Sequence, residues 1–258
     1  NTFDGGITVS AGRLAGSVAS LPGAITNNSE LEFNEAAAAT LATVVSGTGD
    51  LIKSGAGTLT IDAAQTFTGT LEVAAGTVDL GGSGSLDSGI TLATSGTGTF
   101  DLGSNSLAVA ALSGSAGGIT LADGTLTVTS AADIAYGGAI TGSGSLIKAG
   151  AGTLTLSGSN AITTPDDGGT IVSAGRLVGT TASVNGRMQI DSGATLQLDQ
   201  ATTGSLAGSL NGSGDFEKTG VGNLTVGNTN GGYSGDVTIA AGTLTVGTGS
   251  SDFIAGLG

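Results

Sequence analysis

LIKSGAGTLTI, residues 51–61, returns at residues 146–156 as LIKAGAGTLTL and at residues 216–226 as FEKTGVGNLTV. In the first copy, Leu59 and Ile61 alternate with Thr58 and Thr60. An apolar–polar period of two is typical of a β-strand with one buried and one solvated face. A short strand that recurs in one chain indicates a repeat architecture, and this repeat decides the fold.

A second phrase follows each copy of the first. It reads GTLEVAAGTVDLG at 69–81, GTIVSAGRLVG at 169–179 and GDVTIAAGTLTVG at 235–247. Counted from the Gly that opens each first phrase (Gly47, Gly142 and Gly212), the second begins 22, 27 and 23 residues later. This spacing is typical of the coils of a solenoid. A fourth second-phrase, GITVSAGRLAG at 6–16, has no first phrase before it, so we expect the sequence to begin within a module.

The stretches between the phrases predict more short strands. ITL at 90–92, TFDL at 99–102, MQI at 188–190 and TLQL at 195–198 keep the alternation. EAAAATLATVV at 35–45 is the best candidate for a helix, but its Thr and Val residues favour strand. The sequence therefore predicts an all-β parallel β-solenoid without significant helix, with glycine at its corners. About 22 residues per coil give roughly 12 coils in one domain over 1–258, with modules near 6–46, 47–141, 142–211 and 212–258.

Composition excludes several classes of function. The 258 residues include 50 Gly, only 6 Lys and Arg, and carry a net charge of −14, which disfavours a nucleic-acid partner. No apolar run approaches the roughly 20 residues of a membrane helix, so we expect no membrane insertion by this segment. Without Cys or His, disulfides, thiolate or imidazole metal sites and Ser–His or Cys–His catalytic pairs are excluded.

The two phrases together resemble the autotransporter-associated β-strand repeat of type V secreted proteins from Gram-negative bacteria. The resemblance is carried by the pattern G-x-x-x-L-x-K-x-G-x-G-x-L in three copies. The matching positions are Gly47, Leu51, Lys53, Gly55, Gly57 and Leu59; Gly142, Leu146, Lys148, Gly150, Gly152 and Leu154; and Gly212, Phe216, Lys218, Gly220, Gly222 and Leu224. The resemblance implies a right-handed parallel β-helix in a passenger region that is exported across the outer membrane and then displayed on the bacterial surface or released.

Five of the six basic residues lie at repeat positions. Lys53, Lys148 and Lys218 share one position, and Arg13 and Arg176 share another. They could form a basic ladder for an anionic glycan, or they could cap carbonyls at corners and lay their stems along neighbouring coils. The repeat-locked spacing favours the second interpretation. Because Lys53 has the parity of buried Leu51, we expect the strand to turn or bulge there and release the ammonium to solvent.

Candidate sites for metal, sugar and ice are weak. Asp166 and Asp167 follow Pro165 in a turn that could hold calcium, but no cofactor or metal is expected. Two carboxylates could form a glycosidase and Arg187 a lyase base, yet only Tyr136 and Tyr233 could offer amphipathic rings to a sugar, so we expect no enzyme. The Thr pairs 58/60, 125/127, 153/155 and 243/245 could form an ice-binding ladder, but their spacing is irregular.

The sequence thus leaves three functional hypotheses. The first is a structural or adhesive passenger segment, a rigid stalk or spacer outside the cell, whose partner is a host or cell-surface glycan or protein. The second is a fibre subunit that stacks end to end with other copies. The third is a polysaccharide-active β-helix enzyme.

Overall fold

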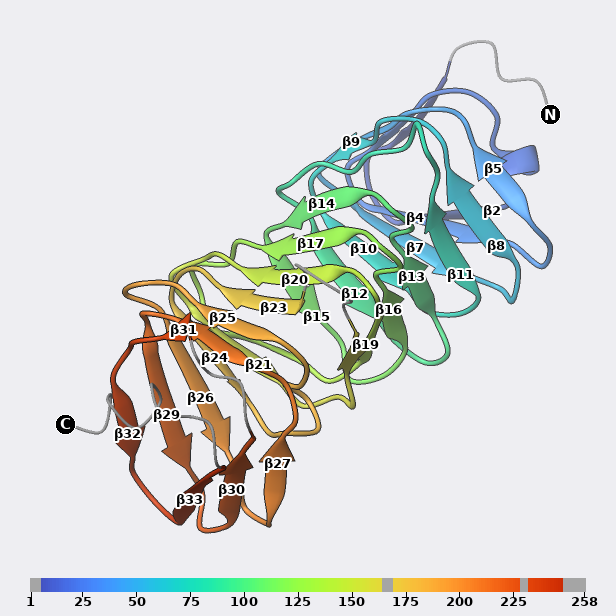
Figure 1. The fold of residues 1–258 in the computed structure, drawn as a ribbon. Helices are drawn as coiled ribbons and strands as arrows, with labels where there is room; N and C mark the ends of the chain where they lie inside the picture. Colours follow the sequence, from blue (N-terminus) through green and yellow to red (C-terminus); the bar gives the residue numbers. More distant parts are fainter. Residues whose placement is uncertain (1–5, 164–168, 228–231, 248–258) are drawn as a thin grey trace. The chain divides into compact units, whose positions relative to one another are not determined.

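The computed structural model describes residues 6–163, 169–227 and 232–247 (Figure 1). The chain divides into two compact units, residues 1–126 and 127–258. The single domain predicted over 1–258 stays a prediction. No helix of the described residues is long and apolar enough to cross a lipid bilayer.

Unit 1 is a stack of coils in which each coil contributes one strand to each of three parallel sheets (Figure 1). The first sheet contains β1 (Ile7–Val9), β3 (Ile25–Asn27), β6 (Val45–Gly47) and β9 (Thr66–Phe67). The second contains β2 (Arg13–Gly16), β4 (Glu30–Asn34), β7 (Asp50–Ser54), β10 (Thr70–Val73), β12 (Thr91–Thr94) and β15 (Ala111–Ser113). The third contains β5 (Ala39–Leu41), β8 (Thr58–Ile61), β11 (Thr77–Leu80), β13 (Thr99–Asp101) and β16 (Gly118–Thr120). A 3₁₀ turn, η1 (Val18–Ser20), and the strands β14 (Ser106–Val109) and β17 (Thr125–Val128) complete the elements up to the unit boundary.

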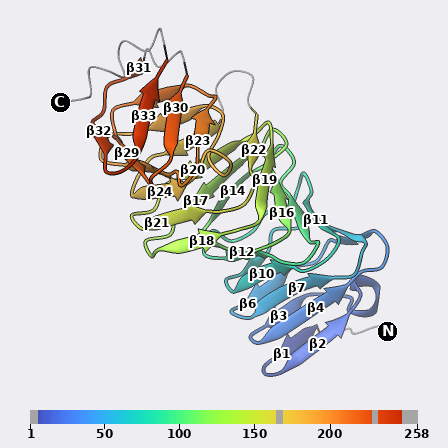
Figure 2. The ribbon, with the colours of Figure 1, turned by 90° about the horizontal axis from the view of Figure 1, so that it is seen from below.

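Unit 2 repeats this architecture, as the second view in Figure 2 also shows. One sheet contains β20 (Ser145–Lys148), β23 (Gly169–Val172), β25 (Met188–Ile190), β28 (Leu210–Gly212) and β31 (Gly232–Tyr233). Another contains β18 (Ile134–Tyr136), β21 (Thr153–Leu156), β24 (Arg176–Gly179), β26 (Thr195–Asp199), β29 (Asp215–Thr219) and β32 (Val237–Ile239). The remaining pairs are β19 (Ala139–Gly142) with β22 (Ala161–Ile162), and β27 (Gly204–Leu206) with β30 (Asn223–Val226) and β33 (Thr243–Val246).

The predicted all-β parallel solenoid is confirmed, with about 12 turns in all. Paired residues of successive coils lie between 17 residues apart, as for Arg13 and Glu30, and 24 apart, as for Ser145 and Gly169. The lysine-bearing copy at 51–61 is followed by its second phrase after 20 residues, because Leu51 pairs with Leu71. The offset of 22 from the sequence is too long because Gly47 and Gly69 are not structurally equivalent. Gly69 lies over Gly49 instead.

The strands expected between the phrases are present. ITL, TFDL, MQI and TLQL fall in or at the edge of β12, β13, β25 and β26, and 35–45 contains β5 and the start of β6 rather than a helix. The strands span two to five residues, slightly shorter than the four to six expected.

Columns of aliphatic side chains form the core. In the second sheet of unit 1, Leu31, Leu51, Leu71, Leu92 and Leu112 lie in register on successive coils. All five are essentially fully buried. Burial of a Leu side chain contributes about 1.5–3 kcal/mol, but each column needs its neighbours above and below to exclude water. Stability therefore depends on the stacking of coils.

Glycine is required where one coil crosses closely over another. A Cβ added to Gly57 would lie 2.2 Å from the carbonyl oxygen of Ala37 in the preceding coil. Gly152 and Gly222, the same position in the other copies, would meet Ala132 and Thr202 at the same distance. A side chain there would push the coils apart, so the second Gly of the G-x-G turn is set by packing.

Candidate functional site

The three lysines of the repeat point into the core. Lys53, Lys148 and Lys218 are fully buried, as are the Leu or Phe two residues earlier, Leu51, Leu146 and Phe216. The expectation that the chain bulges at Lys53 and releases the ammonium to solvent is wrong. The strand keeps its period-two alternation, and the inward parity of Lys53 is real. A basic ladder for an anionic glycan at these three positions is excluded by the same burial.

Each ammonium donates hydrogen bonds to carbonyl oxygens of two adjacent turns. Nζ of Lys53 lies 2.8 Å from the oxygens of Ser54 and Gly55 and 3.1 Å from that of Ala75 in the next coil. Nζ of Lys218 has equivalent bonds to Thr219, Gly220 and Ala241, and Nζ of Lys148 to Gly150 and Ala174. We call residues 51–57, 146–152 and 216–222 the lysine rungs, and residues 74–76, 173–175 and 240–242 the acceptor turns. The predicted capping of corner carbonyls is thus present.

The lysine stem fills the same space as an apolar side chain. Lys53 lies in register between Phe33 and Val73, and Lys218 between Leu198 and Ile239. Burial lowers the pKa of Lys53 and of Lys148 below the ordinary value, and the nearby charges of Glu35 and Asp133 partly oppose this. The three-carbonyl geometry nevertheless suits an ammonium, which has three donors to offer.

The other repeat positions also keep one role in all three copies. Leu59, Leu154 and Leu224 are fully buried on the strand that follows the turn. Gly47, Gly142 and Gly212 end β6, β19 and β28 with φ between 99° and 120°, a conformation that favours glycine. Gly55 and Gly220 also have positive φ, whereas Gly150 does not.

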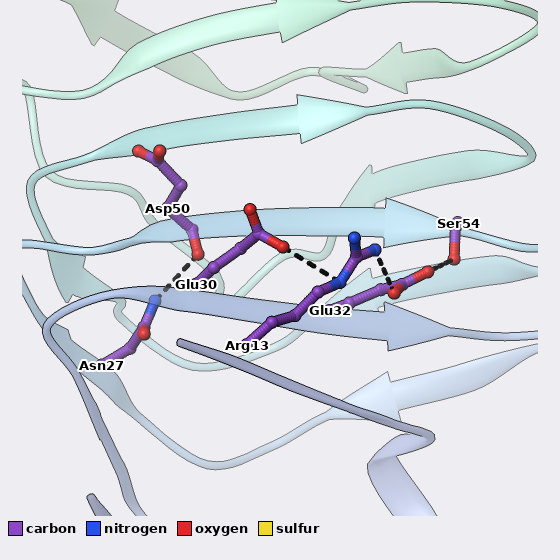
Figure 3. A network of polar contacts seen from close by, with 6 residues as sticks. All are labelled: Arg13, Asn27, Glu30, Glu32, Asp50 and Ser54. Atoms are coloured by element: carbon purple, nitrogen blue, oxygen red, sulfur yellow. Dashed lines mark hydrogen bonds and ion pairs between the residues drawn. The ribbon is translucent and has the colours of Figure 1, made fainter. Parts of the chain in front are cut away.

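Arg13 links coils on the solvated face of unit 1. Its Nε lies 2.9 Å from a carboxylate oxygen of Glu30, and its guanidinium also donates to Glu32, which in turn accepts from Ser54 (Figure 3). The Ser54 hydrogen bond, and then Arg13, hold the pKa of Glu32 below its ordinary value. Glu30 and Glu32 lie on the solvated face of β4, as expected.

Arg176 takes the same repeat position in unit 2 and behaves alike. Its Nη1 lies 2.5 Å from the amide oxygen of Gln197 and 2.5 Å from a carboxylate oxygen of Glu217, on the next two coils. These arginines therefore tie coils together through acidic partners and are not a row of free cations. Exposed ion pairs of this kind contribute about 0.2–1 kcal/mol each.

Several buried polar groups were missed by the sequence reasoning. Gln65 accepts from the Val45 N–H at 2.7 Å, and Asn160 accepts from the Ile140 N–H at 2.7 Å. Asn27 donates to the Asp50 carbonyl at 2.8 Å (Figure 3). Gln65 and Asn160 each follow an alternating strand by four residues, which is a signal that the repeat alignment could have offered. Each amide satisfies backbone groups at a corner.

Tyr233 is a second internal polar group. Its hydroxyl lies 2.9 Å from the carbonyl oxygens of both Gly214 and Asp236. Burial raises the pKa of Tyr233 above its ordinary range. Tyr136 is fully buried as well, so neither ring offers a platform to a sugar.

The Thr pairs do not form one ladder. The pairs 58/60, 153/155 and 243/245 belong to three different sheets. In unit 1, Thr58, Thr77 and Thr99 lie in register, but the neighbouring column continues from Thr60 to Asp79 and Asp101. This interruption by carboxylates removes the regular flat Thr surface that ice binding would need.

Metal and catalytic candidates find little support in the described part of the chain. Asp166 and Asp167 lie outside the described residues. Among residues 6–163, 169–227 and 232–247, no three Asp or Glu side chains gather so that they could hold a metal ion. Arg187 lines a shallow hollow with Ile162, Thr163 and Asn185.

Comparison with known proteins identifies the repeat. The family model of the passenger-associated-transport-repeat matches residues 1–15, 51–80, 146–178 and 216–246. The chain is 38% identical over 124 residues to a protein named "Adhesin BmaC autotransporter" from Brucella suis biovar 1 (strain 1330). That alignment covers 41% of this chain and 4% of the length of that protein. No solved structure matches the chain significantly.

Proposed function

We propose that this chain, whose repeats are those of autotransporter passengers, is a structural segment of a surface-displayed adhesive passenger. It acts as a stiff stalk or spacer and performs no chemistry of its own. It reaches the bacterial surface by export across the outer membrane. A host or cell-surface glycan or protein is the partner of the passenger as a whole.

One observation carries this proposal. The basic side chains at repeat positions, which would have been the natural contacts for an acidic glycan, are used to join coils. Lys53, Lys148 and Lys218 are buried against carbonyls, and Arg13 and Arg176 pair with carboxylates of neighbouring coils. A repeat whose most distinctive side chains serve the stacking of its own coils supports a role in length and stiffness.

The proposal is tested by display of the chain itself. The 258 residues are fused ahead of an autotransporter translocator, with a small binding module of known ligand at the N-terminal end. We expect the module to bind its ligand on intact cells, and the chain without the module to add no binding to host cells or to surface glycans.

Two results would contradict the proposal. Saturable binding of the chain without the module would make the segment itself adhesive. Release of sugar from acidic polysaccharides by the purified chain would support the enzyme hypothesis. Electron microscopy over a concentration series tests the fibre hypothesis, because long filaments would replace short isolated particles.

A further inference from the structure

Unit 1 contains a fourth acceptor turn, residues 10–12, in the sequence VSAGRL at 9–14. The same six residues occur at 172–177, around the acceptor turn of Lys148. There the carbonyl of Ala174 accepts from Nζ of Lys148 at 3.1 Å, and the Ser173 N–H donates to the Lys148 carbonyl at 2.9 Å. The identical sequence makes the two turns directly comparable.

At the fourth turn the corresponding groups are open. Ser10 and Ala11 are exposed, whereas Ser173 and Ala174 are half-buried. Among the described residues, no carbonyl accepts from the Ser10 or Ala11 N–H, and no donor reaches the Ala11 carbonyl. Beside them, Ile7, Val9, Leu14 and Leu21 line a hollow at this end of the unit. Apolar side chains and backbone groups are thus presented together.

The glycine of the fourth turn has the same backbone shape but no neighbour. Gly12 has φ +74°, and Gly76, Gly175 and Gly242 have φ between +66° and +74°. A Cβ added to any of these three would lie 2.4–2.6 Å from two carbonyl oxygens of the lysine rung below it. A Cβ added to Gly12 would meet nothing within 4 Å. The turn therefore has the form that receives a lysine rung, and the space for that rung is open.

We infer that the edge formed by β1 and β2 is a docking site for a separate lysine rung, a segment of the form L-x-K-x-G-x-G-x-L. The known pairs fix its register. As Leu51 and Lys53 pair with Leu71 and Val73, the incoming Leu pairs with Ile7 and the incoming Lys with Val9, and its ammonium reaches the Ala11 carbonyl. The docked strand adds to the parallel sheets by backbone hydrogen bonds, as in β-strand addition.

The charge pattern favours a lysine rung over the last described coil of a second copy. That coil has Ile239, in register with Lys218, where the ammonium would be needed. It cannot donate to Ala11. This inference is independent of the proposed surface role, because it concerns only which segment the edge accepts.

The experiment supplies the rung within the same molecule. Residues 45–61 are added ahead of the full chain through a Gly/Ser linker of about 20 residues, which reaches roughly 25 Å and holds the rung near the edge at about millimolar effective concentration. The chain has no cysteine, so two can be introduced. One replaces Ile52 in the added rung, and the other is Thr8→Cys, its expected partner on the outer face. The readout is the rate of disulfide formation in dilute solution.

Two substitutions make the test specific. Gly12→Asn blocks the approach of the rung, while Asn tolerates positive φ and meets open space in the undocked chain. Gly193→Asn is the matched control, because Gly193 also has positive φ, +83°, and nothing within 4 Å. Equal circular dichroism spectra and thermal midpoints of the two variants establish that both fold.

We expect rapid cross-linking that Lys53→Met in the added rung slows about tenfold and Gly12→Asn slows at least as much. Gly193→Asn should leave the rate unchanged. Three results would overturn the inference: no cross-link above the rate of a scrambled rung, a rate insensitive to Gly12→Asn, or a rate insensitive to the lysine. Self-association of the unmodified chain that Gly12→Asn abolishes, while the added rung does not compete with it, would assign the edge to a second copy instead.

Discussion

Replacement of Lys53 by Met removes the ammonium while it keeps an unbranched side chain of similar length in the column between Phe33 and Val73. Of the three carbonyls that accept from Nζ, that of Ser54 keeps another donor, the Glu35 N–H at 3.0 Å. No other described residue donates to the carbonyls of Gly55 and Ala75. The substitution therefore leaves two half-buried carbonyls without a protein partner.

The net cost follows from two opposing effects. Each carbonyl left without a partner costs about 1–3 kcal/mol, and partial access to water places both near the lower end. Removal of a buried charge recovers part of its desolvation penalty, which acts in the other direction. We expect Lys53→Met to lower the free energy of local opening by about 2 kcal/mol, or roughly a 30-fold change in an opening equilibrium.

Amide hydrogen exchange measures this opening at individual coils, which suits a repeat protein that need not unfold in two states. The Gly57 N–H, bonded to Glu35, and the Ala74 N–H, bonded to Lys53, should exchange about 30-fold faster. Ile52→Met, on the outer face of the same strand, is the matched control and should change exchange less than about threefold. Unchanged or slower exchange in Lys53→Met would refute the reasoning and show that the ammonium does not stabilise the coil.

Three further predictions concern pH and packing. Because burial lowers the pKa of Lys53 and Lys148, the unfolded chain binds more protons than the folded chain just below about pH 10.4, so the free energy of unfolding should rise with pH from about 8.5 to 10. This slope should flatten in the Lys53→Met, Lys148→Met double variant, and urea titrations below pH 10 avoid the opposite effect of Tyr233, whose raised pKa costs stability only above about that pH. Gly57→Ala should cost about 2 kcal/mol or more in urea unfolding because its Cβ meets Ala37, whereas Gly82→Ala, with nothing within 4 Å, should change stability by less than about 0.5 kcal/mol. Tyr233→Phe should cost about 1 kcal/mol because Gly214 and Asp236 lose a shared donor, and a melting temperature equal to that of the unsubstituted chain would contradict this.

The strands and the parallel stacking were predictable because period-two alternation and exact phrase repetition are local signals. Leu59, Leu154 and Leu224 are buried where the alternation places them. Coil length was overestimated, because a repeated phrase fixes its own spacing only when equivalent residues are compared. Leu51 and Leu71 give the correct distance along the chain.

The lysine position shows where local reasoning fails. Parity correctly placed Lys53 on the inner face, and the usual preference of an ammonium for water then suggested a bulge. The preference is overridden because a coil corner offers carbonyls from two adjacent turns, including that of Ala75, 22 residues further along the chain. That juxtaposition exists only once coils are stacked. The pairing of Arg176 with Glu217, 41 residues apart, was hidden for the same reason.

The most direct test of the account is acylation of the folded chain with an amine-reactive reagent, followed by peptide mass spectrometry. The chain has three lysines, and all three lie in the core. The account predicts that only the terminal amine reacts under native conditions and that Lys53, Lys148 and Lys218 react together with it in denaturant. Modification of any of these lysines in the folded chain at the rate of a free lysine would contradict the buried lysine rung.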